Sequence, residues 1–198
     1  MLNYFRFLIH ITHAHRIFRR YFVTNGFDGA LTTLGLIVGF YTADHVAISV
    51  IISACMGAAV ALAVSGFSSA YVSESAERAK ELKELERSLI KNLDHSAHGE
   101  AARLVPVFVA IVNGLAPLSM SLIIIMPLLL AHAGIELPWP PLEMATIVAF
   151  LTLFLLGAFL GRISGRFWLW SSLRTLIIAL LTAAIILALQ QFSSGQGI

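Results

Sequence analysis

The sequence predicts an all-α integral membrane protein with five transmembrane helices, and three observations support this fold class. Of the 198 residues, 58% are hydrophobic and only 12% are charged, which differs strongly from a soluble domain. The apolar residues lie in long runs, and each run approaches the roughly 20 residues that a helix needs to cross the hydrocarbon core. All 13 lysines and arginines lie in three of the stretches that border these runs.

The distribution of positive charge predicts the orientation in the membrane. Arginines precede the first apolar run, and lysines and arginines lie between the second and third runs and again between the fourth and fifth. The breaks at residues 44–45 and 132–143 contain neither residue type. Because short loops rich in lysine and arginine stay in the cytoplasm, the N-terminus is expected there and the C-terminus outside.

An interfacial helix is expected ahead of the first span, within residues 1–24. At about 100° per residue, residues 4–22 place aromatic and aliphatic side chains on one side and arginine and histidine on the other. Such an amphipathic helix lies in the inner interface, with its cations near anionic headgroups.

The five spans are predicted at residues 29–46, 47–73, 104–131, 144–161 and 175–192. Helices are expected because every backbone polar group at membrane depth must be satisfied within its own segment. Between the second and third spans, residues 74–103 form a hydrophilic cytoplasmic segment. The spacing of its leucines predicts a helix that continues from the second span. Residues 1–198 are therefore interpreted as a single transmembrane domain.

Asp28 is the first candidate for a functional residue, because it lies at the cytoplasmic start of the first span. An ionisable group in or beside a membrane span is costly to bury without a partner, so it indicates function by default. The alternative is that Asp28 caps the helix, where its carboxylate would accept backbone N–H bonds. Thr32 lies one turn further on and extends a polar face.

Four glutamates follow the second span and fall within an arc of about 80° on a helix. They are Glu74, Glu77, Glu81 and Glu84. One interpretation is a carboxylate stripe that attracts divalent cations. The other is a solvated helix face held by pairs such as Glu74–Arg78 and Lys80–Glu84, and the pattern alone favours this second interpretation.

Other polar positions within the predicted spans are candidates for lining a pathway. Ser65, Ser68 and Ser69 make the inner half of the second span hydroxyl-rich, although hydroxyls also bond back to their own helix. Asn113, ahead of Pro117, is compatible with a discontinuous helix or with a simple proline kink. Met120 offers a thioether, although methionine more often serves packing.

Two sets of glycines are spaced for close helix contacts. Gly35 and Gly39 form one pair in the first span, and Gly157, Gly161 and Gly165 repeat the spacing near the fourth. Small residues at this spacing let helix backbones approach, within a chain or in a dimer.

An enzyme is not expected, because a serine nucleophile needs a partnered base, and the one histidine within the predicted spans, His45, lies in the polar break at the end of the first. A nucleic-acid partner is not expected either, since the basic residues border membrane spans.

In several short motifs, the chain resembles the vacuolar iron transporter family. The resemblance rests on Arg20-Tyr21, on the segment 26–39, on Tyr71-Val72-Ser73 before a glutamate-rich helix, and on Gly157, Gly161-Arg162 and Ser172-Leu173-Arg174. It implies a homodimer in the lipid bilayer that exports Fe²⁺ or Mn²⁺ from the cytoplasm in exchange for protons. These ions are substrates, and no permanently bound cofactor is implied. Asp28 would be a metal ligand and proton acceptor, and the four glutamates would capture cations.

The chain departs from the family pattern in the second span. Where the family typically has a methionine and then a Gly-Glu pair before Tyr-Val-Ser, this chain has Gly66 and Ser69-Ala70. The expected function is therefore divalent-metal transport with fewer metal ligands than the family pattern has. The expected location is the cell membrane or an organelle membrane such as that of the vacuole. The alternatives are a non-transporting scaffold or metal sensor of the same fold, or a transporter of another substrate.

Overall fold

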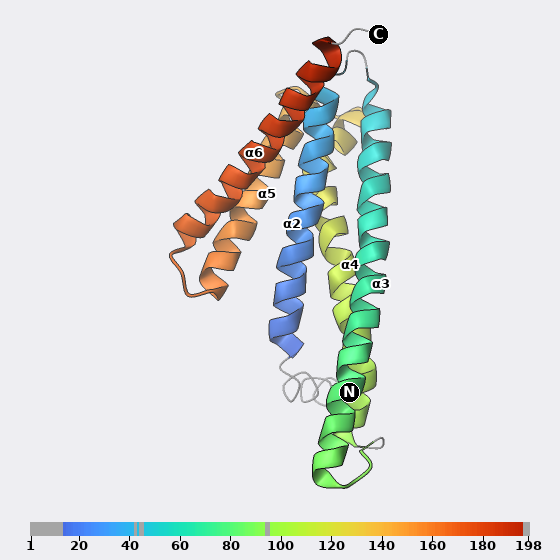
Figure 1. The fold of residues 1–198 in the computed structure, drawn as a ribbon. Helices are drawn as coiled ribbons and strands as arrows, with labels where there is room; N and C mark the ends of the chain where they lie inside the picture. The colour runs from blue at the N-terminus through green and yellow to red at the C-terminus, as the bar shows by residue number, and fades with distance from the viewer. Residues whose placement is uncertain (1–13, 42, 44–45, 94–95, 196–198) are drawn as a thin grey trace. The chain divides into compact units, whose positions relative to one another are not determined.

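The computed structural model describes residues 14–41, 43, 46–93 and 96–195, and side chains from residue 17 to residue 192. Within this part of the chain the regular structure is helical, and no strand occurs (Figure 1). The helices are α2 (Ala14–Tyr41), α3 (Ile48–Leu89), α4 (Ala97–His132), α5 (Pro141–Ile163) and α6 (Trp168–Gly195). The prediction of an all-α protein with five long helices is confirmed for these residues.

Four of the described helices, α3 to α6, are long and apolar enough to cross a membrane. Helices of this kind indicate a lipid bilayer as the environment. The helix α2, which contains most of the first predicted span, is not among them. Its apolar run is interrupted by polar residues such as Asn25, Asp28 and Thr32.

The start and end of the hydrophilic segments differ in detail from the sequence prediction. Residues 1–13 of the expected interfacial helix lie outside the described residues, and residues from Ala14 form the first turns of α2, which continues without a break to Tyr41. The glutamate-rich stretch continues α3 as far as Leu89. Residues 97–103 belong to α4, so the described part of the hydrophilic segment comprises the ends of two long helices and the non-helical residues 90–93 and 96.

The end of α3 is held by its own backbone and by one side chain. Ile90 adopts a left-handed conformation with φ of 51°, and the Lys91 N–H donates to the Glu86 carbonyl at 3.3 Å. The Glu86 carboxylate then accepts the Leu93 N–H at 2.8 Å. This arrangement satisfies carbonyl and N–H groups that a helix end otherwise leaves unpaired.

The chain forms two compact units. The first contains the described residues of Met1–Asn25 and Leu62–Ala116, and the second contains those of Gly26–Ala61 and Pro117–Ile198. In the first unit, small residues of α3 and α4 such as Ala70, Ala101 and Ala110 are buried, and Phe18 and Tyr21 of α2 pack against them.

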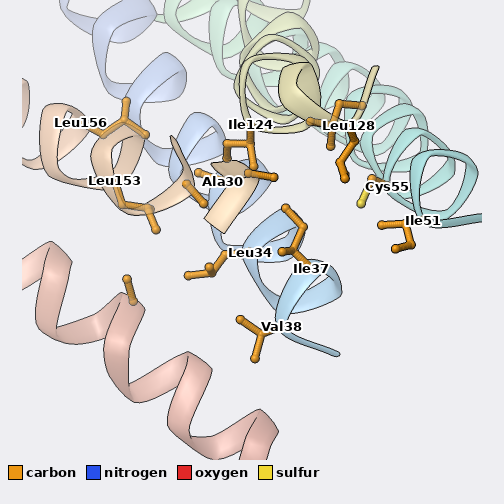
Figure 2. Close-up of a cluster of buried hydrophobic side chains, with 14 residues drawn as sticks. Ala30, Leu34, Ile37, Val38, Ile51, Cys55, Ile124, Leu128, Leu153 and Leu156 are labelled. Carbon is orange, nitrogen blue, oxygen red and sulfur yellow. The ribbon is translucent and has the colours of Figure 1, made fainter. Parts of the chain in front are cut away.

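The second unit has the larger apolar core, shown in Figure 2. Leu34 and Ile37 of α2, Ile124 and Leu128 of α4, and Leu153 of α5 are fully buried there. Gly29 is also part of this packing, because a Cβ atom at that position would lie 2.5 Å from the Cα of Pro117. The backbones of α2 and α4 are therefore in direct contact in this unit.

The glycines predicted from the sequence pack within the chain against α6, except Gly165, which follows the end of α5 with a φ of 65° and has no atom within 4 Å of its Cβ position. A Cβ atom at Gly35 would lie 3.2 Å from Ile186, and one at Gly39 would lie 3.6 Å from the Gln190 amide. A Cβ atom at Gly161 would lie 2.8 Å from the Cα of Trp168. The antiparallel helices α5 and α6, orange and red in Figure 1, thus approach closely through glycine.

We expect Gly157→Ala to destabilise the protein by about 1–3 kcal/mol, because the new methyl group overpacks the contact between α5 and α6. Its nearest neighbours would be the Thr175 hydroxyl oxygen and the Cα atom of Ser172, the latter at 2.8 Å. The measurement is the thermal unfolding midpoint of the purified protein in detergent. The control is Gly57→Ala in α3, where no atom lies within 4 Å of the new methyl group. Equal midpoints for the two variants would contradict the overpacking.

Candidate functional site

Asp28 and Thr32 share the exposed face of α2 in the second unit. The opposite face of the same helix carries the buried Ala30, Leu34 and Ile37. Since α2 begins at Ala14, Asp28 lies well inside the helix, and the alternative of an N-cap is wrong. At membrane depth, where the sequence prediction places the start of the first span, an exposed carboxylate would be unfavourable against lipid and would require water, a cation or a second protein surface.

The buried side of α2 next to Asp28 carries a hydroxyl pair that the sequence analysis missed. The Thr33 hydroxyl lies 2.8 Å from the Gly29 carbonyl oxygen and 2.8 Å from the Ser121 hydroxyl. The Ser121 hydroxyl also lies 3.4 Å from the Gly29 carbonyl oxygen. Both hydroxyls are buried and mutually satisfied, so they stabilise the contact of α2 with α4 in the second unit.

The four glutamates share one face of the continuous helix α3 but differ in exposure and in pairing. Glu74 is buried and Glu77 and Glu84 are exposed, whereas Glu81 is exposed but tied to Arg78. Arg78 lies 2.5 Å from Glu81 and 3.6 Å from Glu74, as nearest nitrogen–oxygen distances. Among the residues that the structure describes, no group of three or more histidine, cysteine, aspartate or glutamate side chains is placed to hold a metal ion.

Glu74 is the centre of a buried polar network in the first unit. The Tyr21 hydroxyl donates to its Oε1 atom at 3.1 Å, and Glu74 and Arg78 are 7% and 9% exposed. The ion pair with Arg78 is too long for a hydrogen bond. Accordingly, Glu74 Oε2 and Arg78 Nε are buried without a hydrogen-bond partner in the described part of the chain. The sequence indicated the Glu74–Arg78 pair through its spacing but gave no signal for Tyr21, 53 residues away.

The phenol of Tyr21, which lies outside the predicted spans, responds to this environment. Burial, and after it the Glu74 carboxylate, raise the pKa of Tyr21 above its ordinary value of 10.0. The guanidinium of Arg20, 5.4 Å from the ring centroid, acts in the opposite direction and is the smaller effect. Because the pKa is higher in the folded state, the stabilisation is complete below pH 10 and is lost as the pH rises through the raised pKa.

Asn113 is 2% exposed and forms hydrogen bonds with two other helices of the first unit. Its amide donates to the Gly66 carbonyl at 2.6 Å, and its side-chain oxygen accepts from Asn25, whose amide also lies 3.3 Å from the Tyr21 carbonyl. The helix α4 is continuous through Asn113 and Pro117, so the hypothesis of a discontinuous helix is wrong. Asn113 is thus placed as a packing residue.

The remaining candidates for a pathway lining divide by exposure. Ser65, Ser68 and Ser69 are exposed on α3, and the Ser69 hydroxyl donates to the Gly66 carbonyl of its own helix at 3.2 Å. Met120 is half-buried in the second unit and packs against its apolar core. Its Cγ atom would lie 3.3 Å from a Cβ atom at Gly26. The serines remain accessible, whereas Met120 serves packing in this structure.

Comparisons with known proteins give a distant relative and no function. The chain is 27% identical over 169 residues to an uncharacterized protein of Methanocaldococcus jannaschii. The matched region covers 84% of this chain and 85% of the relative. No family model matches the chain. No solved structure matches it either. The resemblance to the vacuolar iron transporter family therefore stays a prediction from the quoted motifs.

We expect Tyr21→Phe to lower the free energy of unfolding by about 1–3 kcal/mol, because it removes the hydrogen-bond donor of a buried carboxylate oxygen. The measurement is thermal unfolding in detergent below pH 9. The matched control is Tyr71→Phe, because Tyr71 is 45% exposed. A Tyr21→Phe variant as stable as the control would show that the hydrogen bond to Glu74 contributes nothing to the fold.

Proposed function

We propose that the chain is a membrane transporter that moves a divalent metal ion, Fe²⁺ or Mn²⁺, out of the cytoplasm in exchange for protons. The observation that supports this proposal is the exposed Asp28 in the interior of α2, with Thr32 exposed one turn further on. In a bilayer, such a face requires an aqueous path or a protein partner. The resemblance to vacuolar iron transporters supplies both, as a pathway between two identical subunits.

Asp28 is the proposed metal ligand and proton acceptor. Ionised oxygen ligands suit these cations, and threonine and serine hydroxyls add weaker oxygen ligands. A proton that arrives from outside neutralises the carboxylate, weakens its attraction for the ion and returns inward as the carrier resets. One carboxylate per chain gives few ligands for a divalent cation, so we expect two copies of the chain to contribute ligands to one metal site.

The glutamate-rich end of α3 has a supporting role in this proposal. Glu77 and Glu84 are exposed, and negative charge at the entrance of a path raises the local concentration of cations. Glu74 and Glu81 are engaged with Arg78 and contribute less.

A non-transporting scaffold or metal sensor of the same fold is the second candidate. It is favoured by the engagement of Glu74 and Glu81 with Arg78, and by the missing methionine and glutamate of the second span. A transporter of another substrate would also use the exposed serines of α3.

We expect the protein in proteoliposomes to transport Fe²⁺ or Mn²⁺ when an imposed proton gradient drives protons in the opposite direction. We expect Asp28→Asn to reduce this metal flux to the level of protein-free liposomes. The reason is that the neutral amide neither binds the ion tightly nor exchanges a proton. Glu136→Gln, which removes a carboxylate from the segment between α4 and α5, is the control. Unchanged flux in folded Asp28→Asn would make the mechanism wrong, and no flux in folded wild type would favour the scaffold.

The proposed topology, with five spans and a cytoplasmic N-terminus, has a separate test. In a Cys55→Ser background, Glu136→Cys is expected to react with a membrane-impermeant maleimide in intact cells, whereas Glu84→Cys reacts only after lysis. The reason is that residues 132–143 contain no lysine or arginine, whereas residues 74–103 contain six. The reverse labelling pattern would invert the orientation.

A further inference from the structure

The second unit contains a cavity of about 370 Å³ between α2, α5 and α6. Residues near the C-terminal end of α2, in the N-terminal half of α5 and near the C-terminal end of α6 line it. Its volume falls in the range of roughly 300–1,000 Å³ that is typical of small-molecule sites. The cavity involves neither Asp28 nor the glutamates of α3.

The walls of the cavity are almost wholly apolar, and one formal charge faces it. Val38, Ile147 and Leu187 supply aliphatic surface, and Phe150 supplies an aromatic ring. Glu143 contributes the carboxylate. Within the described residues, no ion pair neutralises Glu143, since both ion pairs there involve Arg78.

The two other polar side chains of the lining do not supply a counter-charge. The Thr146 hydroxyl donates to the Leu142 carbonyl at 2.8 Å, so its hydrogen is already engaged. Tyr41 offers a neutral phenol and an aromatic ring, and it is 57% exposed. Aromatic rings attract cations, and the single carboxylate attracts them further, so the cavity is complementary in charge to a cation with an apolar body.

Glu143 also lies in the first turn of α5, where a carboxylate stabilises the helix dipole. That role explains an acidic residue at this position but not an apolar cavity beside it. The dipole role predicts an effect on stability alone, whereas a binding role predicts an effect on affinity for cations.

We propose that this cavity binds a small amphiphilic organic cation, with its ammonium group paired with Glu143 and its apolar body against Ile147, Phe150 and Leu187. The proposal is independent of metal transport, because the cavity lies on residues that the proposed metal path does not use. In the proposed topology, the lining residues lie toward the outer side of the membrane, so the ligand enters from there.

The test is equilibrium dialysis of tritiated decyltrimethylammonium against the purified protein in dodecyl maltoside. The neutral alkyl chains of this detergent compete for any groove that recognises apolar surface alone. We expect saturable binding of one cation per chain, weakened about five-fold by Glu143→Gln through loss of the charge pair. The matched control, Glu136→Gln, removes a nearby carboxylate that does not line the cavity and should leave the affinity unchanged.

Ala183→Leu tests the location, because the larger side chain fills the cavity from α6 and is expected to abolish binding. If that variant does not fold, Ile147→Trp narrows the same space from α5. Absence of saturable binding to folded wild type, equal affinity in Glu143→Gln, or undiminished binding in both filled variants would each overturn the proposal. Equal weakening by Glu136→Gln would also overturn it, because the charge effect would then be general.

Discussion

The packing of this chain depends on the close approach of helix backbones at glycine. In a bilayer, apolar side chains gain little free energy by moving from lipid into a helix contact, because both surroundings are apolar. Helices therefore associate through tight packing and hydrogen bonds. Gly29 lies against Pro117, Gly114 against the Ala63 carbonyl, and Gly157 against Thr175, with no room for a Cβ atom at any of the three. These contacts bring backbone atoms of different helices close enough for further interactions within each unit.

A side chain on the neighbouring helix donates a hydrogen bond to a carbonyl at several such contacts. Asn113 donates to the Gly66 carbonyl at 2.6 Å, and Gln190 donates to the Gly39 carbonyl at 2.7 Å. Thr175, which faces Gly157, lies 3.1 Å from the Leu153 carbonyl one turn earlier. A glycine exposes the carbonyls around it, and an amide or hydroxyl then uses one of them. Polar residues in apolar runs are therefore mostly explained by packing in this chain.

The sequence was sufficient for the fold class and insufficient for the partners of individual side chains. Long apolar runs and the leucine spacing after residue 74 predicted the helices, because the period of a pattern depends on local geometry. The buried Glu74 accepts a hydrogen bond from Tyr21, 53 residues away, and no local pattern contains that information. Asn113 illustrates the same limit, since its position before Pro117 suggested a broken helix, whereas its hydrogen bonds lie within a continuous one. The spacing of Gly35 and Gly39 predicted close packing correctly, but α6 as their partner required the structure.

Asp28 stands apart from the buried polar residues because packing does not explain it. Asn113, Ser121 and Thr33 are buried and hydrogen-bonded, whereas Asp28 is exposed in the interior of a helix whose other face belongs to the core. Positions that depart from the rule followed by the rest of a chain are where function is expected. A lone carboxylate offers at most two oxygen atoms, and divalent cations generally bind more ligands than that. A second copy of the chain, related by two-fold symmetry, would supply the same face again and double the carboxylates. The proposed transport function and the proposed dimer therefore both depend on Asp28, on the exposed face of α2.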